Sequence, residues 1–394
     1  MKRWLLLGLL VCSGAQAADD LVARGKYLTI LGDCAACHTR KDGPELAGGV
    51  PLDSGFGTIY SRNITPDVQT GIGGWTADQF YRAMHSGRSA DGSHLYPAFP
   101  YPYFTHMTRA DDDAIFAYLK TVPAVSYKPP PNKLPFPLNI RGLMSIWNAL
   151  YFTQGEYKPD PARSAAWNRG AYLVTGLGHC GGCHTPKDWL MGDENDRALS
   201  GGVVEHWFAA DLTGNTRGGL ASWSANDTIE YLKTGRNARA TASGPMGEVA
   251  ELSTSQTSDA DLAAIAEYIK SLAPSAQKQP SAPDPAAMHS GEAIFVDACA
   301  SCHLAGGKGQ PYLFPPLAGN ASVQGSDPTT IVRLVLDGSR SPSTAARPTP
   351  NAMPAFGWKL DDRQVADVVT YVRNSWGNAG EPVEAGAVAK LRKR

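Results

Sequence analysis

Six of the seven cysteines in this 394-residue chain fall in three copies of one short motif. Each copy reads Cys-x-x-Cys-His, so two thiols separated by two residues lie on one turn of chain and a histidine follows directly. This is the spacing of haem c attachment, in which the thiols form thioethers with the two vinyl groups of a porphyrin and the histidine binds the iron. The motifs predict three covalent haem c groups with their iron, on Cys34, Cys37, Cys180, Cys183, Cys299 and Cys302, with His38, His184 and His303 as proximal ligands.

Zinc binding and thioredoxin-like redox chemistry are the alternative uses of closely paired cysteines. Haem attachment is favoured because the motif occurs three times and each copy is followed by a methionine at a matching place in a repeated unit. The seventh cysteine, Cys12, lies in an N-terminal leader. No cysteine then remains for a structural disulfide, although exported chains commonly contain them.

The residues around the motif repeat as well, which indicates one structural unit used three times. A helical stretch with a small residue precedes each motif, at Gly25-Lys26-Tyr27-Leu28, Gly170-Ala171-Tyr172-Leu173 and Gly291-Glu292-Ala293-Ile294. A later helix ends at a glycine expected in the left-handed cap conformation, at Gly87, Gly235 and Gly338. Each unit closes with an amphipathic helix around residues 114–120, 264–270 and 367–373; Ser258-Asp259 and Asp361-Asp362 open two of them.

This unit, an N-terminal helix with a small residue facing a C-terminal helix with an aromatic one, resembles the class I cytochrome c fold. The resemblance implies an all-α fold of three tandem class I cytochrome c domains. In that fold the sixth iron ligand is a methionine from the loop before the last helix, and the matching residues are Met107, Met246 and Met353. A thioether ligand favours the reduced iron and raises its potential, which suits an electron carrier.

Met84 and His106 compete with Met107 for the first iron. Met84 precedes the glycine cap and aligns with helix residue Leu232, so it is interpreted as buried packing. Three histidines and three methionines complete three irons, so the other histidines are interpreted as surface or satisfied polar residues: His85, His94, His179, His206 and His289. A haem with both axial positions filled has no open site for peroxide or nitrite, so no catalytic residue is predicted.

The first seventeen residues have the layout of a cleavable export signal. Lys2 and Arg3 precede an apolar run, and Ala15-Gln16-Ala17 forms a small-residue cleavage site before Ala18. The mature chain is expected to begin near Ala18.

Neither a lipid anchor nor a bilayer-spanning segment is expected in the mature chain. Val11 is bulkier than the usual residue before a lipidated cysteine, which argues against lipidation of Cys12. No later run approaches the roughly 18–20 apolar residues that cross a bilayer. The 36 basic and 37 acidic side chains leave no basic excess for phosphates, which argues against nucleic acid as a partner.

Proline-rich stretches divide the chain into its expected parts. These are a signal peptide at 1–17, cytochrome c domains at 18–127, 163–273 and 286–378, a Pro-rich and aromatic linker at 128–162, a Pro-rich linker at 274–285 and a C-terminal tail at 379–394. Semi-rigid spacers keep the three haem domains at a high effective concentration relative to one another, so electrons can pass from haem to haem within one chain.

An apolar and aromatic stretch at 140–152 lies outside the repeated unit. It is expected either to dock a partner or the membrane interface, or to cap the core of the first domain. Full burial of Trp147 and Phe152 would exclude the docking interpretation.

A closer resemblance is carried by segments spread along the chain: Asn63-Ile64-Thr65-Pro66-Asp67, Gly71-Ile72-Gly73-Gly74-Trp75, His94-Leu95-Tyr96-Pro97-Ala98-Phe99-Pro100, Cys180-Gly181-Gly182-Cys183-His184, Thr234-Gly235-Arg236-Asn237 and Met353-Pro354-Ala355-Phe356. Their combination resembles the triheme cytochrome c subunits of bacterial membrane-associated dehydrogenases for alcohols, gluconate, sorbitol, fructose and aldehydes. The resemblance implies a periplasmic subunit, peripheral on the outer face of the cytoplasmic membrane. Such a subunit takes electrons from a catalytic subunit with PQQ, FAD or molybdenum and delivers them to ubiquinone or an oxidase.

Two other functions stay open at the level of sequence. One is a free periplasmic electron shuttle without an obligate dehydrogenase partner. The other is a haem peroxidase-like enzyme, which needs an iron with an exchangeable ligand, and Met107 is the position at which to look for it.

Overall fold

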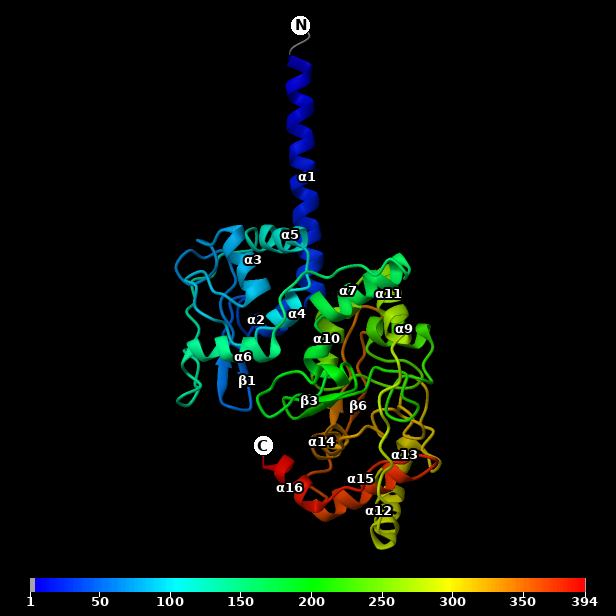
Figure 1. Cartoon of the computed structure of the whole chain (residues 1–394). Coiled ribbons are helices and arrows are strands. Elements are labelled where there is room, and N and C mark those ends of the chain that lie inside the picture. The colour runs from blue at the N-terminus through cyan, green and yellow to red at the C-terminus, as the bar shows by residue number, and fades with distance from the viewer. Residues whose placement is uncertain (1–3, 394) are drawn as a thin grey trace. The chain divides into compact units, whose positions relative to one another are not determined.

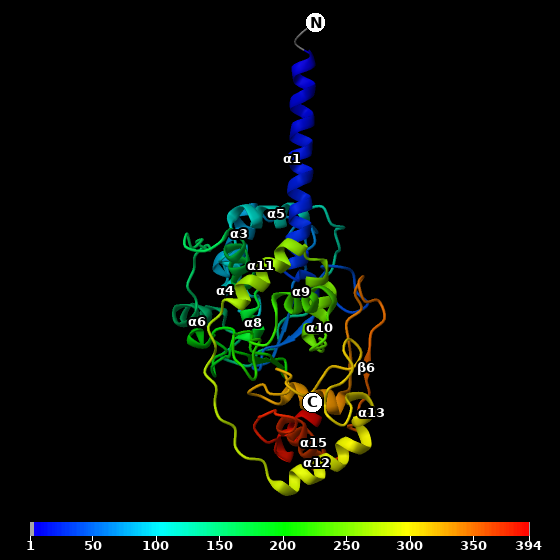
Figure 2. The ribbon, with the colours of Figure 1, turned by 90° about the vertical axis from the view of Figure 1, so that its right-hand side faces the viewer.

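The computed structural model describes residues 4–393, with side chains from residue 18 onward. The export signal expected at 1–17 therefore lies outside the residues whose side chains are described. The chain divides into two compact units (Figures 1 and 2). The first contains the chain up to Asp160 together with Thr175–His179, and the second contains Pro161–Val174 and the chain from Cys180 onward.

The first unit consists of the long helix α1 and several shorter helices around one CxxCH turn and one small hairpin. Its elements are α1 (Trp4–Leu31), α2 (Cys34–His38), β1 (Pro51–Asp53), β2 (Thr58–Tyr60), α3 (Ala77–Ser86), α4 (Tyr101–Phe104), α5 (Arg109–Leu119), the 3-10 turn η1 (Arg141–Leu143) and α6 (Met144–Tyr151).

The second unit repeats this arrangement twice. Its first half contains α7 (Ala165–Tyr172), the π turn η2 (Leu173–Leu177), whose end lies in the first unit, α8 (Gly181–His184), η3 (Asn195–Arg197), β3 (Gly202–Val204), β4 (Trp207–Ala209), α9 (Ala225–Thr234), α10 (Pro245–Leu252), η4 (Thr254–Gln256) and α11 (Asp259–Lys270). Its second half contains α12 (Pro285–Ala298), α13 (Ala300–His303), α14 (Thr329–Asp337), β5 (Ser339–Arg340), β6 (Ala352–Met353), α15 (Asp362–Asn374) and α16 (Ala385–Arg392).

The same pair of helices crosses in each repeat: α1 packs on α5, α7 on α11 and α12 on α15. The small residue predicted at each crossing is a glycine against the backbone of the partner helix. A Cβ added there would overlap a carbonyl oxygen, at 1.8 Å for Gly25 and Ala114, 2.0 Å for Gly170 and Ala264, and 2.2 Å for Gly291 and Asp367. The helices therefore approach more closely than any larger side chain allows.

Helix ends follow the capping chemistry expected from the sequence. Ser258 and Asp361 cap α11 and α15 through their side chains. Gly87 and Gly235 end α3 and α9 in the left-handed conformation. Gly338 differs: its φ is 73° but its ψ is −172°, because the chain passes from α14 directly into strand β5.

The prediction of a purely all-α fold was incomplete. The chain is mainly helical, but each repeat also contains a two-stranded antiparallel hairpin, formed by β1–β2, β3–β4 and β5–β6. The strands are two or three residues long. Runs this short contain too few residues for an alternating pattern to distinguish them from turns.

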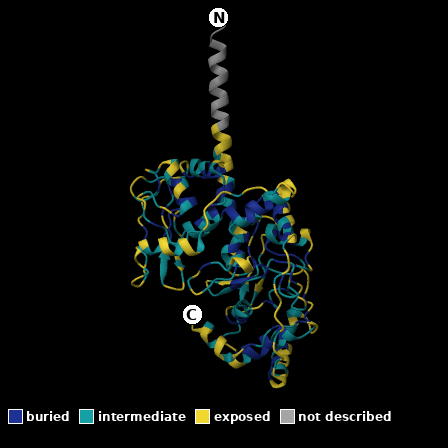
Figure 3. Ribbon diagram, viewed as in Figure 1, coloured by how far each residue is buried: buried dark blue, intermediate teal, exposed yellow. Residues whose placement is uncertain are grey.

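The 140–152 segment both caps the first unit and exposes apolar side chains. Figure 3 colours the described residues by burial. Asn148 accepts a hydrogen bond from the Tyr101 hydroxyl, and the Phe152 ring packs edge-on against Tyr101. The side chains of Ile146 and Leu150, four residues apart on α6, are 61% and 63% exposed. Trp147 and Phe152 are only half-buried, so the full burial that would exclude docking is not found.

Within the described part of the chain, no helix has both the length and the hydrophobicity of a membrane span.

A histidine–aspartate pair is buried in the first unit. His85 Nε2 lies 2.7 Å from Asp112 Oδ2, and both side chains are almost fully buried. The ring of Tyr81 stacks on His85 at 4.0 Å between centroids. His85 is therefore a buried core residue beside Asp112 rather than a surface one.

The variant His85→Ala is expected to lower the free energy of unfolding by about 3–5 kcal/mol at pH 8, because it leaves Asp112 as a buried carboxylate without its partner. Burial raises the pKa of Asp112 to about 6, although the hydrogen bond from His85 opposes this. The Asp112 carboxyl therefore binds a proton more readily in the folded chain than in the unfolded chain. At acid pH the carboxyl is neutral and its burial costs no charge, whereas the loss of stability from its ionisation grows as the pH rises through about 6. Urea unfolding at pH 4.5 and pH 8 should show the smaller loss at pH 4.5.

The matched control is the same histidine replacement in an Asp112→Asn background. In that background the histidine replacement leaves only the cavity of the missing imidazole. The loss in free energy of unfolding should therefore be smaller at pH 8 and independent of pH. An equal loss at both pH values in the single variant would contradict a role for the Asp112 charge.

Candidate haem sites

Each CxxCH motif forms one short helical turn, at α2, α8 and α13. Cys34, Cys180 and Cys299 are thiols whose pKa values burial raises to about 12, about 12 and about 11. Redox-active dithiols need a lowered thiol pKa, which favours the thiolate. The environment of these thiols therefore disfavours the thioredoxin-like interpretation and suits residues that are consumed in thioether bonds.

The three proximal histidines share one hydrogen bond. His38 Nδ1 lies 2.6 Å from the carbonyl oxygen of Arg62, His184 Nδ1 lies 2.6 Å from that of Ala210, and His303 Nδ1 lies 3.0 Å from that of Pro315. A carbonyl oxygen only accepts, so Nδ1 must carry the hydrogen, which leaves the lone pair of Nε2 for the iron. Burial lowers the pKa of all three imidazoles, which favours the neutral form that binds metals. These residues therefore fit haem c.

These carbonyl groups are functional atoms that the sequence did not reveal. They follow their histidines by 24, 26 and 12 residues, so the spacing is not constant. A backbone carbonyl also leaves no signature in residue type. The backbone amides of Gly48 and Gly201 donate hydrogen bonds to the carbonyl oxygens of His38 and His184 in the first two repeats.

The side-chain arrangement disfavours zinc as well. Within the described residues, no three His, Cys, Asp or Glu side chains gather as they do in a metal site. A zinc site needs about four such ligands. Two cysteines that form thioethers with the porphyrin, followed by one histidine for the iron, are instead the attachment residues of a haem c.

The three methionines predicted as distal ligands lie in different settings. Met107 is fully buried between α4 and α5. Met246 is half-buried in the first turn of α10. Met353 pairs with Ser339 across the third hairpin and packs against the core of the third repeat. Met84 is also buried, on the core-facing side of α3, so burial alone does not separate it from Met107.

The remaining histidines occupy varied positions. His94 is buried, and burial lowers its pKa. His289 is exposed on α12, and His206 is half-buried. His106 and His179 both bond to backbone carbonyl groups in the first unit.

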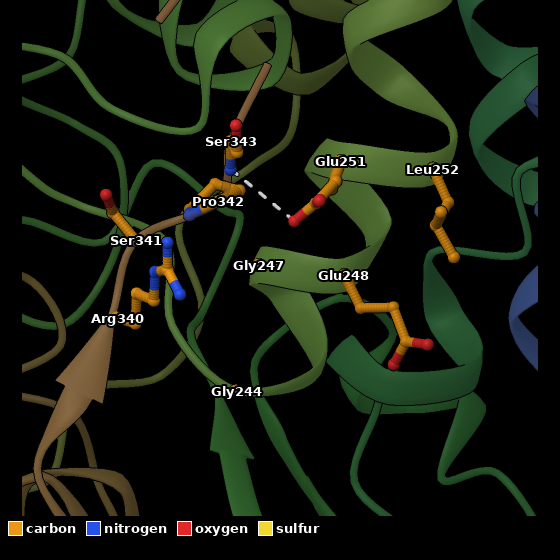
Figure 4. A pocket seen from close by; sticks show the side chains of 9 residues that line it. All are labelled: Gly244, Gly247, Glu248, Glu251, Leu252, Arg340, Ser341, Pro342 and Ser343. Atoms are coloured by element: carbon orange, nitrogen blue, oxygen red, sulfur yellow. Dashed lines mark hydrogen bonds between the residues drawn. The ribbon is translucent and has the colours of Figure 1, made fainter. Parts of the chain in front are cut away.

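A cavity lies beside the turn that carries Met246 (Figure 4). Its walls come from α10, with Glu248 and Glu251, and from the segment 340–343. The Ser343 amide donates to Glu251, while the Ser343 hydroxyl donates to the carbonyl group of Pro348. The cavity therefore presents carboxylates beside the turn that carries Met246, and the Ser343 hydroxyl is hydrogen-bonded to the backbone.

The cytochrome c family matches three stretches of this chain, residues 22–123, 168–273 and 288–376. The gluconate 2-dehydrogenase cytochrome c subunit of Pantoea cypripedii is 40% identical over 100% of this chain and 95% of its own length. The cytochrome c subunit of alcohol dehydrogenase (quinone) from Komagataeibacter europaeus is 40% identical over 98% of this chain and 87% of its own length. The fructose dehydrogenase cytochrome subunit of Gluconobacter japonicus is 38% identical over 96% of this chain and 84% of its own length.

These similarities confirm the resemblance to dehydrogenase cytochrome subunits that the sequence motifs carried. Each of the three matched stretches contains one CxxCH turn with its hydrogen-bonded histidine. The chain belongs to the cytochrome c family and carries three covalent haem c groups.

Proposed function

We propose that this chain is the electron-transfer subunit of a quinone-reducing dehydrogenase complex. It takes electrons from a catalytic subunit with PQQ, flavin or molybdenum and passes them to ubiquinone or a terminal oxidase. The observation that carries the proposal is the threefold CxxCH turn with its fixed histidine tautomer, in a chain that matches dehydrogenase cytochrome subunits over nearly its whole length.

The proposed arrangement is three class I cytochrome c domains at residues 18–127, 163–273 and 286–378. His38, His184 and His303 would hold the three irons together with Met107, Met246 and Met353. Each haem, when bound, supplies reversible one-electron chemistry. The protein contributes the covalent attachment, the orientation of the histidines and the apolar burial that together keep the midpoint potential of each haem high.

The proposed location is the periplasm, on the outer face of the cytoplasmic membrane. The leader at 1–17 supports export. The exposed Ile146 and Leu150 on α6 support a peripheral contact, since no acidic residue occurs between positions 121 and 155 while Lys128, Lys133 and Arg141 do. Apolar side chains flanked by basic ones favour an anionic lipid surface.

Co-purification tests the proposal. The native protein is solubilised with its membranes, the bound subunits are identified by mass spectrometry, and quinone reduction is assayed with alcohols, sugar acids and aldehydes. A flavin, PQQ or molybdenum dehydrogenase in the complex, with substrate-dependent haem reduction, is the expected result. A cytochrome that purifies alone and is reduced by several unrelated donors would instead identify a free shuttle.

A further inference from the structure

The residues that follow the second CxxCH motif form a closed turn, residues 187–193. Its two ends pair in an antiparallel bridge. One carboxylate oxygen of Asp188 accepts hydrogen bonds from the amides of Leu190 and Gly192, at 2.9 and 3.0 Å. The Asp188 amide in turn donates to the carbonyl oxygen of Gly192 at 3.0 Å. The backbone of this turn is therefore held in one conformation by its own hydrogen bonds.

The base of the turn is fastened to α8, the short helix of the CxxCH motif. The Lys187 ammonium donates to the carbonyl oxygen of Gly181 at 3.2 Å, and Gly181 lies between the two thioether cysteines. The same ammonium forms an ion pair with Asp193 at the other end of the turn. Because both side chains are largely buried, water weakens this pair less than it weakens a surface pair. The 187–193 turn is therefore fixed beside the second haem attachment site.

The tip of the turn presents apolar side chains to solvent. Trp189 is 81% exposed and Met191 is 37% exposed. Met191 has a φ of 61°, in the left-handed region that residues with a Cβ seldom adopt. A tryptophan in solvent adds little to the core, whereas tryptophan and methionine are enriched where proteins contact one another. The tip therefore has the composition of a contact site.

The rim of the turn is acidic. Four acidic and two basic side chains occur within residues 187–197: Asp188, Asp193, Glu194, Asp196, Lys187 and Arg197. Both basic groups pair with acidic members of this set, Lys187 with Asp193 and Arg197 with Glu194. The whole chain has 36 basic and 37 acidic side chains, so the negative excess is local. An anionic lipid surface would repel this rim, whereas a protein face with lysine and arginine around an apolar pocket would complement it.

We propose that Trp189 and the acidic rim of residues 187–197 form the docking site for the catalytic dehydrogenase subunit. This inference rests on the proposed function, in which that subunit docks beside a haem site. The partner face is a pocket that receives the indole ring, surrounded by lysine and arginine side chains. Trp189 supplies the buried anchor of such an interface, and the rim, with its exposed Asp196, supplies the electrostatic complement.

Photo-crosslinking in the native complex tests the position of the docking site. The full chain carries Trp189→p-benzoylphenylalanine, the membranes are irradiated, and the crosslinked protein is identified by mass spectrometry. The catalytic subunit is the expected product. The same replacement at Trp358, which is 83% exposed in the third repeat, is the matched control and should capture no catalytic subunit. A product with an oxidase or another protein at position 189, or no product, would overturn the inference.

A binding measurement tests the size of the contribution. Trp189→Ser should weaken binding of the purified catalytic subunit to the three-haem chain by about thirtyfold, the effect of one aromatic hot spot. Trp358→Ser should leave the affinity unchanged. Asp196→Lys should slow association at low salt, and the difference should shrink at high salt because the rim acts through long-range attraction. Circular dichroism should be unchanged in all three variants, since the replaced side chains are exposed.

The same measurement separates this inference from the proposed function. A dehydrogenase that binds the wild-type chain and Trp189→Ser equally well would contradict the docking site and leave the proposed function standing. A wild-type chain that binds no dehydrogenase would contradict the proposed function and the docking site together.

Discussion

Replacing Met107 by leucine is expected to lower the midpoint potential of one haem by about 0.1–0.2 V, a part of the roughly 0.8 V that axial ligands span. The other two haems should keep their potentials, because their proposed ligands, Met246 and Met353, lie in the other unit. A thioether stabilises the reduced iron, and leucine offers no donor atom in its place. Potentiometric titration of the purified protein, followed at the haem absorption bands, measures the shift.

Ligand loss in Met107→Leu should also open a coordination position. The sulfur–iron charge-transfer band of the oxidised protein should fall by about one third, since one haem of three loses its sulfur ligand. Carbon monoxide should then bind rapidly to one reduced haem per chain, whereas the wild-type protein should bind little. This acquired reactivity separates ligand loss from a general loosening of the fold.

Two matched variants distinguish the candidates at the first iron. Met84→Leu replaces a second buried methionine of the same unit, on α3, and should leave the spectrum and the potentials unchanged. His106→Gln should likewise leave the spectrum and the potentials unchanged, because Met107 is the proposed ligand and glutamine keeps an N–H donor for the carbonyl group of Thr175. A potential shift in Met84→Leu with none in Met107→Leu would reverse the assignment.

The parts of the fold that the sequence revealed are those that depend on residue type. Thioether attachment needs cysteine, and the iron ligand that follows the cysteines in this motif is a histidine, so the CxxCH turns could be assigned directly. The helix crossings need a residue without a Cβ, which explains why Gly25, Gly170 and Gly291 recur before each motif. No other residue type meets these requirements, so the same residues recur in every repeat.

The parts that the sequence did not reveal depend on backbone geometry. The carbonyl groups of Arg62, Ala210 and Pro315 orient the histidines, yet any residue can supply a carbonyl oxygen. The kink at Gly176, in the π turn after α7, looks in sequence like a continuing helix, since Leu173, Val174 and Leu177 are all apolar. Where a function depends on the main chain, only the folded structure shows it.

The variant Gly170→Ala is expected to lower the free energy of unfolding by about 2–3 kcal/mol, the upper part of the range for an overpacked core. The new Cβ would lie 2.0 Å from the carbonyl oxygen of Ala264 and 2.9 Å from the Cβ of Tyr268. Both are held by the backbone of α11, so the clash cannot be relieved by a rotamer change and α7 must move away. Chemical denaturation of the three-haem protein, followed by circular dichroism, measures the loss.

The matched control for this variant is Gly386→Ala, the same change in helix α16 at a position with no neighbouring atom within 4 Å of the added Cβ. Because alanine is a better helix former than glycine, the control should be neutral or stabilising. The opposite signs would show that the loss in Gly170→Ala comes from the helix contact and not from the removal of a flexible residue. A similar loss of stability in Gly25→Ala and Gly291→Ala would show that all three repeats depend on the same close helix contact. A neutral Gly170→Ala would mean that α7 and α11 do not cross as closely as the structure places them.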